Sequence, residues 1–549
     1  MRAADYLVQA LAQEGVEVVF GYPGGAIMPI YDALVDAPFK HVLVRHEQGA
    51  ALAADGYARA TGKVGVCLAT SGPGATNLVT GIANAYLDSV PMVAITGQVS
   101  TDVLGTDAFQ EVDMLGITLP VVKHSFLPKK PEDLVTMIPE AFRIARSGRP
   151  GPVLVDIPKD VAMAEVKASL QFGQGYDEPE QPDLHHVRAA ANLLRSSQKP
   201  VIYAGGGIGM ANAVEEFRAF VTESGIPVVS TLKALGTLPS EHPQFLGMLG
   251  MHGLKAANMA VMESDLLIVI GARFDDRATG KLDTFAPNAA IIHMDIDAAE
   301  LGKLRRPHVA PRGDIRTCMK ALSFPAGLDS WQDWCQTQKA CWAWNYDAPV
   351  PGIYAPGFLR DLSLKVGPKT IVSCDVGQHQ MWVAQHFAFH APYQHLSSGG
   401  LGTMGYGLPA AIGAAWGKPD HTVILVSGDG SIMMNIQELA TLNRYQIPVK
   451  IVLFDNQRLG MVRQWQELFY KQRFSEVDLS DNPEFVRVAE SFGIPGMKIT
   501  RKEEVAEAQQ ILLDAPGSFF LHVRIDAGDN VWPLVPPGKS NAQMMEGAR

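Results

Sequence analysis

The sequence predicts an α/β protein built from three doubly wound, parallel-sheet domains. Short apolar runs alternate with Gly-rich turns and amphipathic stretches along the whole chain, which is typical of parallel strands buried under helices. The length of 549 residues corresponds to about three or four domains at roughly 150 residues each. A pattern repeated near the two ends of the chain indicates that the first and third domains share one fold.

Composition excludes several functional classes. Hydrophobic residues make up 47% of the chain and the formal net charge is −11, which predicts large cores, a mildly acidic surface and no general affinity for nucleic acid. No apolar run in the sequence is long enough for a membrane span. We expect stretch 1–20, which carries Asp5 and Glu14, to form an amphipathic helix and not a signal peptide. The five cysteines lack CxxC spacing, so no disulfide scaffold or zinc site is predicted, and a cytoplasmic location is the simplest.

Eight apolar runs predict buried strands, at residues 64–70, 92–96, 153–157, 201–204, 266–270, 291–294, 422–427 and 450–454. Two stretches, at about 165–185 and about 324–357, lose this periodicity and gain Gly and Pro. We therefore expect domains at 1–165, 185–325 and 357–549.

The repeat lies in residues 56–98 and 407–457. Each stretch contains, in order, a Gly-Lys pair, an apolar run, the motif Ser-Gly-x-Gly, a helical stretch, and a second apolar run that follows a proline. Ser71 and Pro91 are 20 residues apart, and Ser427 and Pro448 are 21 apart. Any two strand–helix–strand units look broadly alike, but this matching punctuation favours a shared fold, and two similar domains favour a ligand between them.

The clearest chemical signal is Gly428-Asp429-Gly430, followed after 24 residues by Asp455-Asn456. Each motif directly follows a predicted strand. Because the carboxyl ends of parallel strands meet at one edge, Asp429 and Asn456 can share a cation through oxygen ligands, which suits Mg²⁺. A helix beginning near Ser431 would attract an anion such as phosphate. The alternative is a pair of ordinary turns.

At this spacing the two motifs resemble the diphosphate–Mg²⁺ signature of the thiamine diphosphate (ThDP) enzymes, with Asp455 standing where that family has a first asparagine. The resemblance implies that Asp429, Asn456 and the main-chain carbonyl of Arg458 hold Mg²⁺. It also implies that the diphosphate and thiazolium end of the cofactor is lined by Gly377, Gln378, His379, Gly428, Gly430, Ser431, Gly460 and Met461.

Glu47 lies between an apolar run at 41–45 and a predicted helix at 48–60. A carboxylate there could simply cap the helix. The ThDP resemblance implies another role, in which a glutamate hydrogen-bonded to N1′ of the aminopyrimidine promotes the imino tautomer that takes the thiazolium C2 proton. The resemblance places six further residues near this glutamate: Tyr22, Pro23, Gly24, Pro73, Asn77 and Gln110. It also implies that Val376 and Met404 support the bent cofactor; the alternative is that they are ordinary core residues. The two cofactor halves would be held by first and third domains of different subunits, in a homodimer or larger assembly.

The middle domain carries Gly205-Gly206-Gly207-Ile208-Gly209 after the apolar run 201–204. This is not GxGxxG, and no acid follows at dinucleotide spacing, so the stretch is weak as a NAD motif. Charged side chains follow two later strands, at Arg273, Asp275 and Asp295. They could bind the phosphates and ribose of a nucleotide; equally, the domain could be Rossmann-like without a ligand.

Motifs along essentially the whole chain resemble the catalytic large subunits of the acetohydroxyacid (acetolactate) synthases: GYPGGAIMPIYDAL, RHEQGAA, ATSGPGATNL, GARFDDR, HMDIDAAE, LGTMGYGLPAA and NQRLGMVRQWQELF. Members of that family bind FAD in the middle domain although their reaction has no net redox change. The resemblance implies FAD contacts from Arg149, Gly206, Gly207, Thr231, Leu232, Met251, His252, Gly271, Arg273, Asp275, Asp295, Ile296, Glu300, Gly313 and Asp314. It implies that Arg277 meets the substrate carboxylate and that Trp465 shapes the pocket for the second 2-keto acid. Near the reacting groups it places Phe109, Gln110 and Lys159.

The implied reaction is decarboxylation of pyruvate and condensation with pyruvate or 2-ketobutyrate, giving 2-acetolactate or 2-aceto-2-hydroxybutyrate for isoleucine and valine biosynthesis. A small regulatory subunit is an allowed partner; nucleic acid and membrane are not expected. The alternatives are a pyruvate oxidase with redox-active FAD, a simple 2-keto-acid decarboxylase and a non-catalytic scaffold. Decarboxylases often use an adjacent His pair, but the only one here, His185-His186, falls in the linker before the middle domain. Intact Glu47, Asp429 and Asn456 argue against a scaffold.

Overall fold

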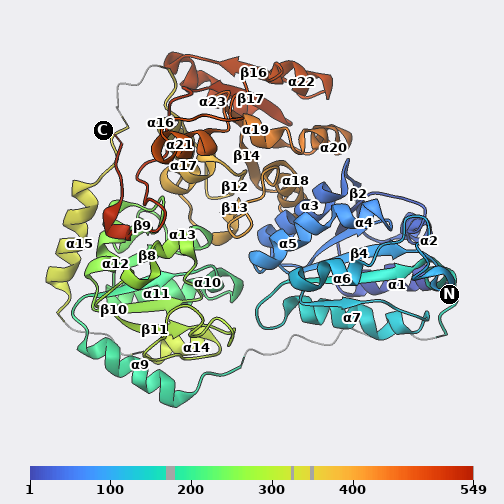
Figure 1. Ribbon diagram of the computed structural model, residues 1–549, viewed down its shortest axis with the longest axis horizontal. Helices are drawn as coiled ribbons and strands as arrows, with labels where there is room; N and C mark the ends of the chain where they lie inside the picture. The colour runs from blue at the N-terminus through green and yellow to red at the C-terminus, as the bar shows by residue number, and fades with distance from the viewer. Residues whose placement is uncertain (168–179, 323–326, 347–351, 548–549) are drawn as a thin grey trace.

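The computed structural model describes residues 1–167, 180–322, 327–346 and 352–547. They form three sheets covered by helices (Figure 1). Every pairing between neighbouring strands is parallel. The predicted α/β class with three parallel-sheet domains is therefore confirmed. The domain boundaries stay predictions, and parts of both predicted linkers lie outside the described residues.

The first sheet has the strand order β2-β1-β3-β4-β6-β5. Its strands are β1 (Val18–Gly21), β2 (Lys40–Leu43), β3 (Gly65–Ala69), β4 (Met92–Gln98), β5 (His124–Phe126) and β6 (Pro152–Pro158). The helices are α1 (Ala3–Gln13), α2 (Met28–Ala33), α3 (Glu47–Thr61), α4 (Pro73–Asn77), α5 (Val79–Leu87), α6 (Met114–Thr118), α7 (Asp133–Arg146) and α8 (Lys159–Met163). The central strands β3, β4 and β6 are buried at every residue, as continuous apolar runs predict for parallel sheets.

The middle sheet has the order β11-β10-β7-β8-β9. Its strands are β7 (Pro200–Ala204), β8 (Val228–Ser230), β9 (Phe245–Met248), β10 (Leu266–Ile270) and β11 (Ala290–Met294). The helices are α9 (Leu184–Ser196), α10 (Gly207–Met210), α11 (Val214–Ser224), α12 (Lys255–Glu263), α13 (Asp276–Thr279), α14 (Ile315–Lys320) and α15 (Asp329–Cys341). The C-terminal end of the chain, red in Figure 1, returns to this domain, where Val535 N donates to Met251 O at 2.8 Å.

The third sheet has the order β13-β12-β14-β15-β17-β16. Its strands are β12 (Thr370–Cys374), β13 (His395–Ser397), β14 (Thr422–Gly428), β15 (Val449–Asp455), β16 (Gly496–Ile499) and β17 (Phe519–Arg524). The helices are α16 (Ala355–Lys365), α17 (Gln378–His386), α18 (Gly407–Gly417), α19 (Asp429–Ile432), α20 (Leu439–Tyr445), α21 (Gly460–Phe469), α22 (Phe485–Ser491) and α23 (Val505–Asp514).

The third sheet repeats the first strand for strand, with β12 in the place of β1 and β14 in the place of β3. The predicted likeness of the two domains is therefore confirmed. The equivalent helices α3 and α18 pack directly on each other. An added Cβ would lie 1.9 Å from Ala53 O at Gly413 and 2.2 Å from Ala410 O at Gly56. Because only glycine allows this approach, the two repeated domains are joined backbone to backbone.

Two expectations are wrong in detail. Stretch 1–20 is not a single helix: α1 ends at Gln13, Gly15 has a φ of +79°, and the β-branched Val18 and Val19 belong to β1. The pair His185-His186 lies not in a linker but in the first turn of α9, where both side chains are exposed. Among the residues that the structure describes, no helix combines the length and apolar character needed to cross a bilayer.

Candidate active site

A cavity opens at the carboxyl edge of the third sheet, where β12, β14 and β15 end. The space that it encloses is about 540 Å³, including open solvent at its mouth. Its walls hold every third-domain residue for which cofactor or metal binding is predicted, namely Val376, Gly377, Gln378, His379, Met404, Gly428, Asp429, Gly430, Ser431, Asn456, Arg458, Gly460 and Met461. Turns that are far apart in sequence thus converge on one space.

Asp429 is the buried carboxylate of this cavity. It begins α19, is 3% exposed, and accepts a hydrogen bond from Asn482 Nδ2 at 2.9 Å. Burial, together with the negative charge of Asp455, raises the pKa of Asp429 to about 8. A divalent cation would offset this desolvation, and the neighbouring amide of Asn456 and the carbonyl of Arg458 are the oxygen donors that Mg²⁺ prefers. No group of three His, Cys, Asp or Glu forms a metal cluster in the described part of the chain, so a cation here would depend on these amide and main-chain oxygens.

Asp455, the departure from the ThDP signature, does not line the cavity. Its Oδ2 lies 2.8 Å from His522 Nε2, and its Oδ1 lies 3.1 Å from Arg524 Nη1. Burial opposes ionisation, but the hydrogen bond to His522 holds the pKa of Asp455 below its usual range. His522 and Arg524 therefore balance its charge from β17, although that charge also raises the pKa of Asp429.

Close-packed turns and a buried histidine form part of the cavity wall. Gly460, where α21 begins, lies against the side chain of Gln378, and an added Cβ there would come 2.0 Å from Gln378 Oε1. The ring of His379 lies against Gly377 and Gly428, where an added Cβ would come within 2.8 and 2.9 Å of it. Burial lowers the pKa of His379 to about 3, and its Nε2 has no partner among the described residues. A neutral ring in the wall is thus left unsatisfied by the protein.

Asp375, which was not predicted from the sequence, supports the backbone beside two of the apolar residues that line the cavity, Val376 and Met404. Its Oδ1 accepts the N–H of Val376 and the N–H of Gly405, each at 2.9 Å. Its Oδ2 accepts from Ser427 Oγ at 3.0 Å. One buried carboxylate therefore fixes the turn after β12 and the backbone next to Met404. An acid directly after an apolar run was the signal that could have found it.

The first-domain residues gather at the carboxyl edge of their own sheet. Glu47 is the first residue of α3, and Asn77 Nδ2 donates to its Oε2 at 3.0 Å. An added Cβ would lie 3.2 Å from Glu47 Oε1 at Gly74 and 2.4 Å from Thr70 Cγ2 at Gly24. The turns after β1 and β3 therefore meet beside Glu47.

The remaining predicted residues of this domain follow neighbouring strands. An added Cβ at Gly72 would lie 2.9 Å from Gln110 Cβ, which brings Gln110 to the turn after β3. Phe109 is 89% exposed. Four others sit where strands end or helices begin: Tyr22, Pro23, Pro73 and Lys159.

The third domain anchors the turn before Glu47 through a residue that carries no local signal. Buried Glu438 accepts, at Oε1, the N–H of Arg45 at 2.9 Å and of His46 at 3.1 Å. Even so, the chain does not bring Glu47 into the third-domain cavity, whose lining residues all lie between Val376 and Ile525. The structure thus holds two separate clusters, one on each repeated sheet.

Nearly all the residues with predicted FAD contacts follow strands of the middle sheet and share its carboxyl edge. They are Gly206, Gly207, Thr231, Leu232, Met251, His252, Gly271, Arg273, Asp275, Asp295, Ile296 and Glu300. Gly207 N donates to Gly271 O, and Gly313 N, next to Asp314, donates to Asp295 O, each at 3.1 Å. Thr231 Oγ1 is buried without a partner in the described residues. Touching glycine turns and an unsatisfied hydroxyl fit a bound nucleotide.

Two arginines lie at the carboxyl edge of the middle sheet. Arg149, from the first domain, places Nη1 2.7 Å from Glu300 Oε1 and 3.2 Å from Asp297 Oδ2, so its charge is already paired. Arg273 is half-buried, and its positive charge opposes the burial that raises the pKa of Asp275. A guanidinium beside glycine turns fits an anionic dinucleotide.

The predicted substrate residues lie on separate domains. Arg277, in α13, is 62% exposed, and its Nη1 lies 3.6 Å from Met251 Sδ. Trp465, in α21, is half-buried, and its ring meets Phe469 edge-on at 5.6 Å between centroids.

Comparison with known proteins agrees with this arrangement. Three family models described as "Thiamine pyrophosphate enzyme" match the chain. The N-terminal TPP binding domain matches residues 1–117, the central domain matches residues 187–322, and the C-terminal TPP binding domain matches residues 375–523. The chain is 56% identical to the acetolactate synthase isozyme 2 large subunit of Escherichia coli K12, covering 100% of both chains. It is 46% identical to the isozyme 1 large subunit of the same organism, covering 99% of this chain and 97% of the other. It is 48% identical to the acetolactate synthase large subunit of Corynebacterium glutamicum, covering 99% and 90%.

Proposed function

We infer that the chain, which belongs to the thiamine pyrophosphate enzymes and within them to the acetolactate synthase large subunits, decarboxylates pyruvate and joins the product to a second 2-keto acid. The products are 2-acetolactate from pyruvate and 2-aceto-2-hydroxybutyrate from 2-ketobutyrate, early steps toward the branched-chain amino acids. The observation that carries this proposal is the meeting of Asp429, Asn456 and three glycine turns in one cavity, in a chain 56% identical over its full length to one such enzyme.

The chain's own residues have distinct tasks. Bound ThDP supplies a carbon nucleophile and an electron sink for decarboxylation. Asp429, Asn456 and the carbonyl of Arg458 would hold Mg²⁺ against the diphosphate. Glu47 would share a proton with the aminopyrimidine nitrogen, while Val376 and Met404 would support the bent cofactor. The support for these roles is the burial of Asp429 and the apolar wall that Met404 gives the cavity.

FAD belongs to the proposal as the ligand of the middle domain. Half-buried Arg273, the unsatisfied Thr231 hydroxyl and the contact between Gly207 and Gly271 support it. FAD would bind there without changing its redox state, because the reaction consumes no electrons.

We propose that a working site needs a second copy of the chain. Glu47 and the third-domain cavity lie in separate clusters within one chain, so the Glu47 cluster of one subunit would complete the cavity of its partner. Exposed Phe109 (89%) and Met434 (51%) are apolar residues that such an interface would cover. The relatives' names specify a large subunit, so we add a small regulatory partner. The five free thiols support a cytoplasmic location.

One assay tests the function against its rivals. The purified chain is incubated with pyruvate, ThDP and Mg²⁺, and acetolactate, acetaldehyde and acetate are quantified while the flavin spectrum is followed. We expect acetolactate as the main product and an unchanged flavin spectrum without an external electron acceptor. Acetate with flavin bleaching would indicate an oxidase, acetaldehyde a decarboxylase, and no turnover a scaffold.

A further inference from the structure

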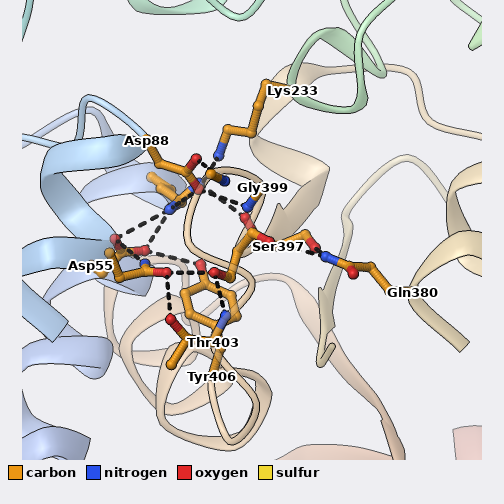
Figure 2. A network of polar contacts seen from close by, with 12 residues as sticks. Asp55, Asp88, Lys233, Gln380, Ser397, Gly399, Thr403 and Tyr406 are labelled. Carbon is orange, nitrogen blue, oxygen red and sulfur yellow. Dashed lines mark hydrogen bonds and ion pairs between the residues drawn. The ribbon is translucent and has the colours of Figure 1, made fainter. Parts of the chain in front are cut away.

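A buried network of charged side chains joins the three domains (Figure 2). At its centre lies Arg59, on α3, between two carboxylates. Its Nε donates to Asp55 Oδ1 at 2.5 Å, and its Nη2 donates to Asp88 Oδ2 at 2.7 Å. The three side chains are 8%, 0% and 1% exposed. Because removing one partner of such a pair leaves a buried charge uncompensated, the network is a fixed part of the fold.

The first-domain carboxylates hold a segment of the third domain, residues 397–406, which we call the Met404 segment. Asp88 accepts the N–H of Gly399 at 3.0 Å and of Gly400 at 2.8 Å. At the far end of the segment, the hydroxyl of Tyr406 donates to Asp55 Oδ1 at 2.9 Å. Both ends of the Met404 segment are therefore bound to α3 and the residue that follows α5.

The middle of the segment is fixed by Asn84, on α5. Its Oδ1 accepts from Ser398 Oγ at 2.6 Å and from Thr403 Oγ1 at 3.2 Å. Ser398 Oγ in turn accepts the N–H of Thr403 at 2.9 Å. These bonds close the segment into a turn immediately before Met404, the residue that enters the cofactor cavity.

Glycine and the middle domain complete the arrangement. An added Cβ at Gly400 would lie 2.8 Å from Leu87 Cβ, so only glycine lets the segment approach this closely. Lys233 Nζ lies 3.2 Å from Asp88 Oδ2, next to the predicted FAD contacts Thr231 and Leu232. The two carboxylates are thus balanced by two cations, one of them from the middle domain.

We propose that Asp88 is a positioning residue for the ThDP cavity: by binding Gly399 and Gly400 it fixes the Met404 segment, although Asp88 itself lies outside the cavity lining. The network belongs to a single chain, so each subunit sets its own third-domain wall before a second copy joins. The inference rests on the proposed function only for the identity of the cofactor.

The variant Asp88→Asn tests this. It keeps the side-chain shape but removes the charge that two N–H groups and two cations share. In cofactor-free protein we expect faster hydrogen–deuterium exchange confined to the Met404 segment. ThDP affinity should fall about 10–100-fold, the range for lost charge-assisted hydrogen bonds, with little change in KM for pyruvate.

The matched control is Glu14→Gln, because Glu14 is also a buried acid (4% exposed) that pairs with Arg146, at 3.0 Å. It should lower stability and leave both readouts unchanged.

Ser398→Ala is the milder second variant, because it removes only the hydroxyl that meets Asn84 and Thr403. We expect the same two changes, smaller in size, and it carries the test if Asp88→Asn does not fold. Normal exchange in the Met404 segment and normal ThDP affinity in either folded variant would overturn the positioning role. Failure of the wild-type chain to bind ThDP would instead contradict the proposed function, since the exchange measurement needs no cofactor.

Discussion

The first and third domains carry their chemistry at the same edge of the same fold, but the residues there differ in one decisive position. Ser71-Gly-Pro-Gly lies in the turn after β3, and Ser427-Gly-Asp-Gly spans the end of β14 and the start of α19. Pro73 starts a helix and brings no charge, whereas Asp429 brings a buried carboxylate. The two domains thus share one strand order but present different groups at this edge: Glu47 in the first domain and the cavity that holds Asp429 in the third.

Burial separates the two carboxylates further. Asp429 is 3% exposed, and burial raises its pKa to about 8, so its ionised form needs a cation. Glu47 is half-buried and receives a hydrogen bond from Asn77, and the proposal gives it proton transfer and not metal binding. Breaking each acid should therefore remove a different step: cofactor retention in the third domain and proton transfer in the first.

The largest effect is expected from Asp429→Ala. Losing the only side-chain carboxylate of the proposed Mg²⁺ site leaves the diphosphate charge poorly neutralised, so Mg²⁺-dependent ThDP binding should be abolished while the fold is retained. Calorimetric titration with ThDP measures this, and circular dichroism checks the fold. Asp420→Ala is the control, because Asp420 lies in the same domain but pairs at the surface with Lys369. Normal ThDP affinity in Asp429→Ala would remove the metal assignment.

Glu47→Gln should retain ThDP and lose proton transfer. Glutamine keeps the shape of the side chain but cannot share a proton with the aminopyrimidine, and general acid–base roles are worth about 10²–10⁴-fold. Exchange of the C2 proton of the bound cofactor, followed by NMR, should slow by that factor. Glu17→Gln, which alters a surface partner of Lys63 in the same domain, serves as the control. An exchange rate equal to that of the wild type would leave Glu47 as a helix cap only.

Combining Asp429→Ala and Glu47→Gln in one dimer tests whether each active site is shared between two subunits. If Glu47 of one subunit completes the Asp429 cavity of the other, each mixed dimer contains one intact and one doubly broken site. Co-expression with random pairing should then recover about a quarter of wild-type activity, with half of the dimers mixed and half of their sites intact. Two differently tagged chains, purified in tandem, isolate the mixed dimer for assay. No recovery in the isolated mixed dimer would place the complete site within one chain.

Sequence alone predicted the parts of this architecture that have a local cause. All eight apolar runs contain strands, because continuous burial leaves a continuous apolar signature. The strands β5, β8, β9, β12, β13, β16 and β17 were not among these runs. Three of them, β5, β8 and β13, have only three residues, too few to show a period. β1 was assigned to a helix, because the amphipathic pattern of α1 runs into it.

The site divides in the same way. Asp429 and Asn456 stand in motifs that mark strand ends, so they could be found without a structure. Glu438, which binds the backbone of His46 from 392 residues away, and Asp88, which binds Gly399 from 311 residues away, have no neighbours in sequence that reveal their partners. Their roles follow only from how the domains pack.

Helix α21 reverses the usual amphipathic arrangement. The sequence places Met461, Trp465, Leu468 and Phe469 on one face, which would ordinarily be the core face. In the structure the buried residues of this helix are instead Arg463 and Gln464. The side-chain amide of Gln464 makes two hydrogen bonds with the backbone of Val531. Val531 N donates to Gln464 Oε1, and Gln464 Nε2 donates to Val531 O, each at 2.9 Å. The polar face is therefore the anchored one, and the aromatic face is left for a ligand or partner.

Trp465→Leu should give the smallest change, in product choice and not in activity. Trp465 is only half-buried, so it is not needed to fill a core, and α21 starts at the cavity wall through Gly460 and Met461. We expect the indole to contact the extra methylene of 2-ketobutyrate, which is worth roughly 1–3 kcal/mol, or about 10–200-fold in selectivity. The variant should therefore lose most of the preference for 2-ketobutyrate while acetolactate formation from pyruvate continues. With pyruvate fixed and 2-ketobutyrate varied, both products are quantified together, and Leu468→Ala controls for loss of apolar surface on the same face. An unchanged product ratio would mean that the half-buried aromatic face of α21 serves the subunit contact and that selectivity resides elsewhere in the cavity.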